Sequence, residues 1–254
     1  MDTDTSSSSL PAPRALILHG FSGNLETVRA LGPLCEARGL PYRMPLLRGH
    51  GTRPEDLVGV TWRDWYADAE QALLSLTSDG TRAVILGLSM GGLLALDLAA
   101  RHADRVCGVV TIAAALELSN PLLPLLPLLA RVKPWWNGKR RPGRTVPVAY
   151  PRFPLRGVAS LVEYATEVRT RLREVKAPLL VLASRADDMV TARAASDIAH
   201  GVGSTQVTTV WFERSEHDML IGEESTSVVD WIDHWLDRYL TGWRLGEARP
   251  GSGE

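Results

Sequence analysis

The apolar positions of this chain form short continuous runs that alternate with stretches of helical periodicity. The runs are rich in leucine and β-branched residues, as in strands that are covered on both faces of a parallel sheet. They lie at 14–18, 83–88, 105–113, 177–184 and 206–212. A further run at 41–47 contains two prolines, which predicts a short, marginal strand.

Helical periodicity fills most of the intervals between these runs. Between 61 and 76 the large apolar residues recur at i, i+3, i+4 and i+7, the spacing of one buried helix face. Similar arguments predict helices at about 24–38, 61–76, 91–102 and 193–200, and a final amphipathic helix through 228–239. Strands alternating with helices of this length predict an open α/β sheet with right-handed crossovers.

This alternation stops after Ala115. The next sixty or so residues hold Pro-Leu-Leu repeats, the pair Trp135-Trp136, a basic run at 139–144 and an amphipathic pattern through 158–172. Such a segment is too long for a structureless loop, so we predict an insertion with short helices of its own. The predicted organisation is a disordered lead at 1–13, a core at 14–115 and 175–241, an insertion at 116–174 and a flexible tail at 242–254.

The run at 83–88 leads into a Gly-x-Ser-x-Gly motif at 87–91, and a Gly/Leu/Ala-rich helical pattern follows at once. Strand, tight turn and helix in this order place the Ser89 hydroxyl above the sheet, and the glycines let helix and strand approach. The amide of Met90 then lies at a helix N-terminus, directed to where an oxyanion would form. Ser89 is therefore the candidate nucleophile.

A serine hydroxyl needs an adjacent base and a group that orients that base. Of the six histidines, His217 directly follows the last predicted strand, at the sheet edge where catalytic groups of open α/β sheets gather. Asp187 and Asp188 follow the penultimate strand, and both are candidates for the orienting acid. His19 and His50 lie in glycine-rich loops, and we assign them no chemistry.

Composition narrows the class of protein. With 254 residues, 45% hydrophobic and 22% charged, the chain has the composition of an ordinary globular protein. Its net charge of -1 disfavours a nucleic-acid or anionic-membrane partner. The acidic N-terminus lacks the apolar segment of a secretory signal, and no run is long enough to span a membrane, so we expect a soluble, cytoplasmic enzyme.

The chain has two cysteines. Cys35 and Cys107 fall in a predicted helix and strand, where they are expected to be small buried hydrophobes. No Cys/His cluster with ligand spacing occurs, so neither a metal nor an organic cofactor is expected.

Taken together, these motifs resemble the α/β-hydrolase superfamily, in particular small bacterial carboxylesterases and monoacylglycerol lipases with a short cap. The matching segments are 18–24, 47–52, 61–65, 87–92, 185–190 and 215–217. The chain order Ser89, Asp187, His217 is the order of this family. The resemblance implies an α/β-hydrolase fold: a mostly parallel central sheet flanked by helices, with a small helical cap inserted at 116–174.

The resemblance also assigns roles within the site. It implies Asp187 rather than Asp188 as the orienting acid, and the backbone N–H of Phe21 as the second oxyanion donor beside Met90. In that family a small residue, commonly glycine, precedes the histidine. This chain departs from the pattern, because Glu216 stands at that position. That carboxylate is either a solvated charge or close enough to the base to raise its pKa.

The implied activity is that of a serine carboxylesterase acting on short- to medium-chain esters, without a cofactor. Phe21, Trp135 and Trp136 are candidates for lining the acyl pocket, and the 139–144 run is either a solvated loop or a site of attraction for anionic substrates. Monoacylglycerol lipase is the nearest alternative, followed by C–C hydrolase, thioesterase and a slow-turnover receptor on the same fold. The expected partner is a small ester, and the expected state is a monomer or weak homodimer.

Overall fold

The computed structural model describes residues 12–120, 123–126, 129–130, 133–137 and 149–244. Three predictions therefore lie wholly or partly outside the described residues. They are the disordered lead, of which only 12–13 are described, the basic run at 139–144, and the tail beyond 244.

Six parallel strands form the central sheet in the order β2-β1-β3-β4-β7-β8. They are β1 (Arg14–Leu18), β2 (Tyr42–Arg43), β3 (Ala83–Leu88), β4 (Val106–Ile112), β7 (Leu179–Ser184) and β8 (Val207–Phe212). Every described pairing in this sheet is parallel. Strands β3, β4 and β7 are buried at every position, which explains why their sequences are continuous apolar runs. The predicted parallel sheet is confirmed.

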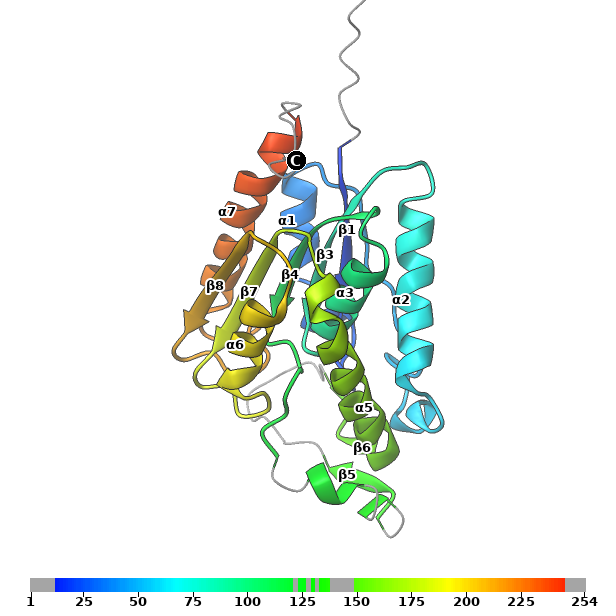
Figure 1. Ribbon diagram of the computed structural model, residues 1–254. Helices are drawn as coiled ribbons and strands as arrows, with labels where there is room; N and C mark the ends of the chain where they lie inside the picture. Colours follow the sequence, from blue (N-terminus) through cyan, green and yellow to red (C-terminus); the bar gives the residue numbers. More distant parts are fainter. Residues whose placement is uncertain (1–11, 121–122, 127–128, 131–132, 138–148, 245–254) are drawn as a thin grey trace, which may run out of the picture.

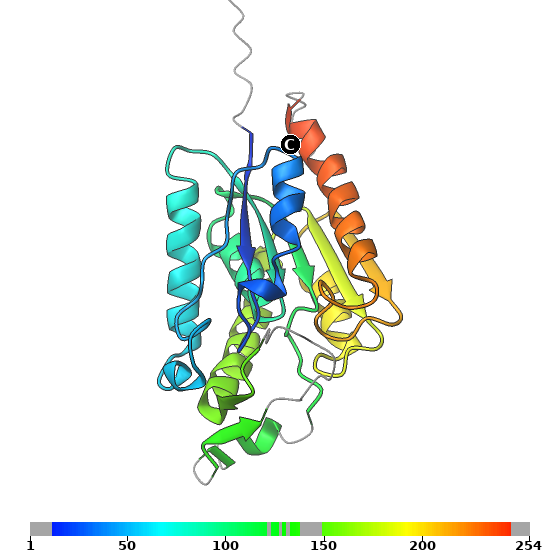
Figure 2. The ribbon, with the colours of Figure 1, turned by 180° about the vertical axis from the view of Figure 1, so that it is seen from behind.

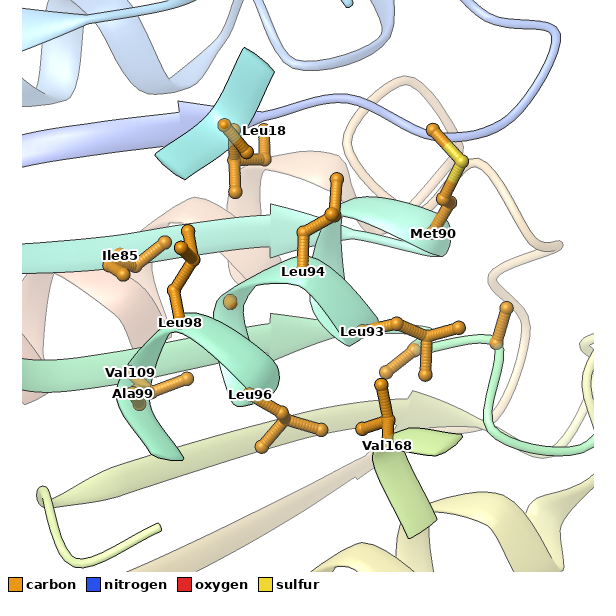
Figure 3. Close-up of a cluster of buried hydrophobic side chains, with 14 of the residues drawn as sticks. Leu18, Ile85, Met90, Leu93, Leu94, Leu96, Leu98, Ala99, Val109 and Val168 are labelled. Carbon is orange, nitrogen blue, oxygen red and sulfur yellow. The ribbon is translucent and has the colours of Figure 1, made fainter. Parts of the chain in front are cut away.

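Helices cover both faces of the sheet (Figures 1 and 2). They are α1 (Leu31–Ala37), α2 (Trp62–Leu76), α3 (Met90–Arg101), α5 (Leu155–Arg171), α6 (Ala192–Gly201) and α7 (Ser225–Arg244). One hydrophobic cluster packs α2, α3, α5 and α6 against the sheet, and a second packs α1 and α7 against the opposite face. Figure 3 shows the leucines of α3 in the first cluster, with Val168 of α5 beside them.

Local chemistry accounts for several element boundaries. Thr61 and Asp64 form a reciprocal capping box at the start of α2. The predicted helix at 24–38 is instead broken into a 3₁₀ turn, η1 (Leu25–Thr27), and α1. Asn24 caps η1 rather than a long helix, because its side chain accepts a hydrogen bond from the Glu26 amide at 2.9 Å.

Two boundaries differ in length from the prediction. The run at 41–47 pairs only through the two residues of β2, because the prolines that bracket β2 have no N–H to donate to a ladder. Helix α7 continues to Arg244, so residues 242–244 of the expected tail are helical. A 3₁₀ turn, η2 (Pro54–Leu57), separates β2 from α2.

The segment between β4 and β7 contains more than short helices. Besides α5 it holds η3 (Leu123–Leu125), η4 (Leu172–Glu174) and a two-stranded antiparallel ribbon of β5 (Trp135–Asn137) and β6 (Arg152–Pro154). The ribbon, which the sequence analysis did not anticipate, lies beyond the carboxyl ends of the parallel strands (Figures 1 and 2). Within the described part of the chain, no helix has the length and apolar character needed to cross a bilayer.

Candidate active site

Ser89 occupies a strained turn between β3 and α3. Its backbone has φ 56° and ψ -113°, a region that residues with a side chain rarely adopt. A Cβ on Gly91 would collide with the carbonyl oxygen of Leu18, and one on Gly87 would collide with that of Gly91. The glycines of the Gly-x-Ser-x-Gly motif are therefore required for the helix to start this close to the strands.

Ser89, His217 and Asp187 form one hydrogen-bonded line. The His217 Nε2 atom lies 2.9 Å from Ser89 Oγ, and its Nδ1 atom lies 2.9 Å from Asp187 Oδ2. A carboxylate only accepts hydrogen bonds, so Nδ1 carries the proton and Nε2 is free to accept the serine O–H. The histidine and aspartate side chains are 7% and 3% exposed, which shields this line from solvent.

Asp187 is held by its own loop as well as by the histidine. Its Oδ1 atom accepts the amides of Met189 and Val190 at 2.8 and 3.0 Å. Burial acts to raise the pKa of this carboxyl, but the hydrogen bond and charge of His217 and the two amides outweigh it and lower the pKa. The neighbouring Asp188 is exposed.

The loop that carries His217 is anchored to the residue before α7. The buried Ser215 hydroxyl donates to Glu224 Oε2 at 2.7 Å, and the Arg214 amide donates to the same oxygen at 3.0 Å. The Ser215 hydrogen bond keeps the pKa of Glu224 below its usual value. Glu216 is exposed and lies between the buried Ser215 and His217.

The predicted oxyanion donors come from two different loops. Met90 is the first residue of α3, where an amide has no acceptor within the helix. Gly20 lies directly over the serine, because a Cβ built on it would be 3.2 Å from Ser89 Cβ. Phe21 follows, and its ring makes edge contacts with Trp65 and Phe153 at centroid distances of 5.5 and 5.6 Å.

His19 and His50 are buried beside this loop as neutral rings. His19 Nε2 accepts the Leu47 amide and His50 Nε2 accepts the Ser22 amide, each at 3.1 Å. Burial lowers the pKa of His19 to about 3 and that of His50 to about 4. Both rings therefore stay uncharged at neutral pH and join the loops at 19–23 and 47–50.

Trp135 and Trp136 lie in the β5–β6 ribbon with cations over their rings. Arg152 lies 4.7 Å from the Trp135 ring and Lys133 lies 5.3 Å from the Trp136 ring. Trp136 is directly paired with Phe153, so these two side chains share one ribbon face, whereas Trp135 is on the other. Phe153 contacts Phe21, the predicted second oxyanion donor, and was missed by the sequence analysis, since no motif marks it.

The described residues contain no group of three or more His, Cys, Asp or Glu side chains arranged to hold a metal ion. Ser89, His217 and Asp187 are instead arranged for acyl transfer, because a candidate nucleophile, base and orienting acid are in hydrogen-bond contact.

The family described as Serine aminopeptidase, S33 (Hydrolase_4), matches residues 11–225 of this chain. The chain belongs to this family. The S33 match runs from β1 to the start of α7, so it contains Ser89, Asp187 and His217.

Relatives of this S33 member carry the names of ester hydrolases. It is 28% identical over 217 residues to the thermostable monoacylglycerol lipase of Bacillus sp. (strain H-257), covering 85% of this chain and 86% of the relative. It is 26% identical over 230 residues to the carboxylesterase of Bacillus subtilis (strain 168), covering 88% and 92%.

Among solved structures, a chain reported with the metagenome-derived lipolytic enzymes LipS and LipT superposes with a TM-score of 0.83. The two are 28% identical, and the match covers 91% of this chain and 96% of that one. The fold is that of the α/β-hydrolases, and the resemblance to carboxylesterases and monoacylglycerol lipases is confirmed.

Proposed function

We propose that this carboxylic ester hydrolase cleaves short- to medium-chain esters through an acyl-enzyme formed on Ser89. The observation that carries the proposal is the line of two 2.9 Å hydrogen bonds from Ser89 through His217 to Asp187, at the elbow between β3 and α3. A carboxylate can only accept, so this line lets His217 donate from Nδ1 to Asp187 and keep Nε2 for the serine O–H, as nucleophilic attack requires.

The mechanism follows from the geometry. His217 Nε2 takes the Ser89 proton as Oγ attacks the acyl carbon, and Asp187 stabilises the resulting imidazolium. The amides of Met90 and Phe21 bind the oxyanion of the tetrahedral intermediate. His217 then protonates the leaving alcohol, and water attacks the acyl-enzyme through the same steps in reverse order.

The segment at 116–174 serves in this proposal as a cap over the nucleophile. Helix α5 is its base, because Leu161, Tyr164 and Val168 are buried in the core cluster. Phe21 and Phe153 are both half-buried and pack against each other, which supports an apolar wall next to the proposed oxyanion donor. Such a wall suits an acyl chain of limited length and offers no charge to bind an ionic substrate.

The central test is replacement of the nucleophile. Ser89→Ala is expected to lower kcat on a 4-nitrophenyl ester by at least about 10⁴-fold, since the remaining site offers only binding and oxyanion stabilisation. Ser78→Ala is the matched control, because Ser78 is exposed and bonds only its own helix end at Ser75. Full activity in Ser89→Ala would disprove the proposal. Tight ester binding by the wild-type protein with negligible turnover would instead favour a receptor.

The second candidate is monoacylglycerol lipase, which the relative with that name supports as strongly as the other relative supports carboxylesterase. Rates on 4-nitrophenyl esters of increasing chain length, measured beside monoacylglycerols, separate the two. Preference for a long-chain monoacylglycerol would select the lipase.

The ribbon offers a test of the acyl pocket with its own control. Trp136 shares the face of Phe153, which contacts the oxyanion loop, so Trp136→Ala is expected to shift the preferred chain length. Trp135→Ala, on the opposite face, is expected to leave the profile unchanged. The reverse result would remove Trp136 from the pocket.

A further inference from the structure

Both limbs of the 116–174 segment are paired by backbone with loops of the site. In the outgoing limb, Leu118 forms an antiparallel bridge with Val190, in the loop of Asp187. In the returning limb, Ala149 forms an antiparallel bridge with Gly23, in the loop of Phe21. The segment is therefore tied directly to the loops of the orienting acid and of the oxyanion donor.

Tyr150, the residue after Ala149, adds three hydrogen bonds to the contact of the returning limb. Its amide donates to the Ser22 carbonyl at 2.9 Å. Its hydroxyl donates to the Gly49 carbonyl and accepts the Thr52 amide, each at 3.0 Å. One residue of the insertion thus holds the loop at 19–23 against the loop at 47–52.

The residue that Tyr150 holds in the first loop is under strain. Ser22 has φ 58°, in the left-handed region that favours glycine. Its amide donates to His50 Nε2 and its carbonyl accepts from Tyr150, so both sides of the strained residue are bonded to other segments. Strained backbone of this kind persists only where its surroundings over-determine it. Ser22 directly follows Phe21, so these bonds restrain the chain on the C-terminal side of Phe21.

We propose that Tyr150 is a positioning residue of the oxyanion hole, through which the cap holds the Phe21 amide in its productive orientation. This inference rests on the proposed function, since it takes the Phe21 amide to be an oxyanion donor. The phenolic hydroxyl acts through the Gly49 and Thr52 backbone and touches no reacting atom. Loss of that hydroxyl removes the two bonds to the Gly49 and Thr52 backbone, while the Tyr150 ring and amide remain. The bonds of His19 and His50 still join the two loops, so the expected effect is a small shift rather than unfolding of the loops.

The test is Tyr150→Phe, which removes only the hydroxyl. An oxyanion donor misplaced rather than deleted is expected to lower kcat by about tenfold, below the roughly 10²–10³-fold cost of losing a donor outright. KM is expected to stay within about twofold. A trifluoromethyl ketone analogue of the ester, which forms an oxyanion on Ser89, is expected to bind about tenfold more weakly. A non-hydrolysable ether analogue is expected to keep its affinity.

Tyr42→Phe is the matched control, because the half-buried Tyr42 also donates its hydroxyl to one partner, Glu36, but in an exposed hydrogen bond on the edge strand β2. It is expected to change none of these quantities. An unchanged kcat in Tyr150→Phe overturns the positioning role, and so does an equal loss of affinity for the ketone and the ether. If Ser89→Ala abolishes turnover while Tyr150→Phe is silent, only this inference fails. If Ser89→Ala retains full activity, the proposed function fails with it.

Discussion

Replacement of Asp187 by asparagine tests how the histidine is kept in its working tautomer. Asp187 Oδ1 accepts the amides of Met189 and Val190, and Oδ2 accepts His217 Nδ1–H. An asparagine in this site must place its carbonyl oxygen where the two amides donate. Its NH₂ group then faces His217, and a donor in that position requires Nδ1 to become the acceptor. The ring proton moves to Nε2 and points at Ser89. The protonated Nε2 atom can then no longer accept the serine proton.

The expected magnitude follows from this inverted tautomer. An intact site with the wrong histidine tautomer loses about 10⁴-fold in kcat, equivalent to about 5 kcal/mol of transition-state stabilisation. Steady-state hydrolysis of a 4-nitrophenyl ester at neutral pH measures this loss of kcat. Thermal unfolding is the accompanying check, because asparagine keeps the shape and the two amide bonds, so the melting temperature is expected to change little.

Asp188→Asn is the matched control, since Asp188 is one residue along the same loop and exposed. It is expected to retain kcat within about twofold, as surface substitutions generally do. A loss in Asp188→Asn equal to that in Asp187→Asn, or a kcat above a tenth of wild type in Asp187→Asn, would refute the assignment of the orienting acid.

Three further predictions concern stability, each measured by urea unfolding. Gly91→Ala is expected to destabilise the fold by about 3 kcal/mol, because its Cβ would press on the Leu18 carbonyl and force α3 from the sheet; wild-type stability would contradict it. Asp97→Ala is expected to cost about 2–3 kcal/mol, because that fully buried carboxylate accepts bonds from an arginine and a buried tyrosine. The third prediction concerns the stability of the fold at acidic pH. With folded pKa values of about 3 and 4, His19 and His50 bind protons more weakly in the folded than in the unfolded chain. Stability is therefore expected to fall as the pH drops from about 6.5 towards 4, by about 1.4 kcal/mol per pH unit for each histidine, and His50→Gln should remove one of these two contributions.

The parts of the molecule that could be predicted from sequence are those in which local pattern and tertiary role coincide. Strands β3, β4 and β7 are buried on both faces, so their apolar runs are unbroken. The elbow at Ser89 is readable because its glycines are required by close backbone approach, which leaves a fixed spacing in the sequence. Strand order indicated His217 and left Asp187 and Asp188 as candidates, because catalytic loops follow the strands of a parallel sheet. Only the family resemblance favoured Asp187, the one of the two that bonds His217.

The rest depends on neighbours that are remote in sequence. Tyr150 contacts the Gly49 carbonyl across 101 positions, and no spacing rule links the two. Phe153 reaches the oxyanion loop through a ribbon whose strands are only three residues long, too short for a period to be detected. The break between η1 and α1 did have a signal that the sequence analysis missed. Pro33 cannot lie in the interior of a helix that starts at residue 24, and α1 begins at Leu31 so that Pro33 falls in its first turn.

Backbone strain in the described chain is concentrated at the site. Its non-glycine residues with positive φ are Ser22, Ser89 and Ala113, with φ of 58°, 56° and 47°. Ser22 follows Phe21, Ser89 is the elbow, and Ala113 directly follows β4, with its amide bonded to the Leu182 carbonyl of β7. Each is held by hydrogen bonds to other segments of the chain, so none can relax without breaking those bonds. Conformations that cost of order 1–3 kcal/mol each persist here because the buried strands behind them supply the offsetting packing. A strained edge of this kind is suited to hold Ser89 and His217 at hydrogen-bond distance before any substrate arrives.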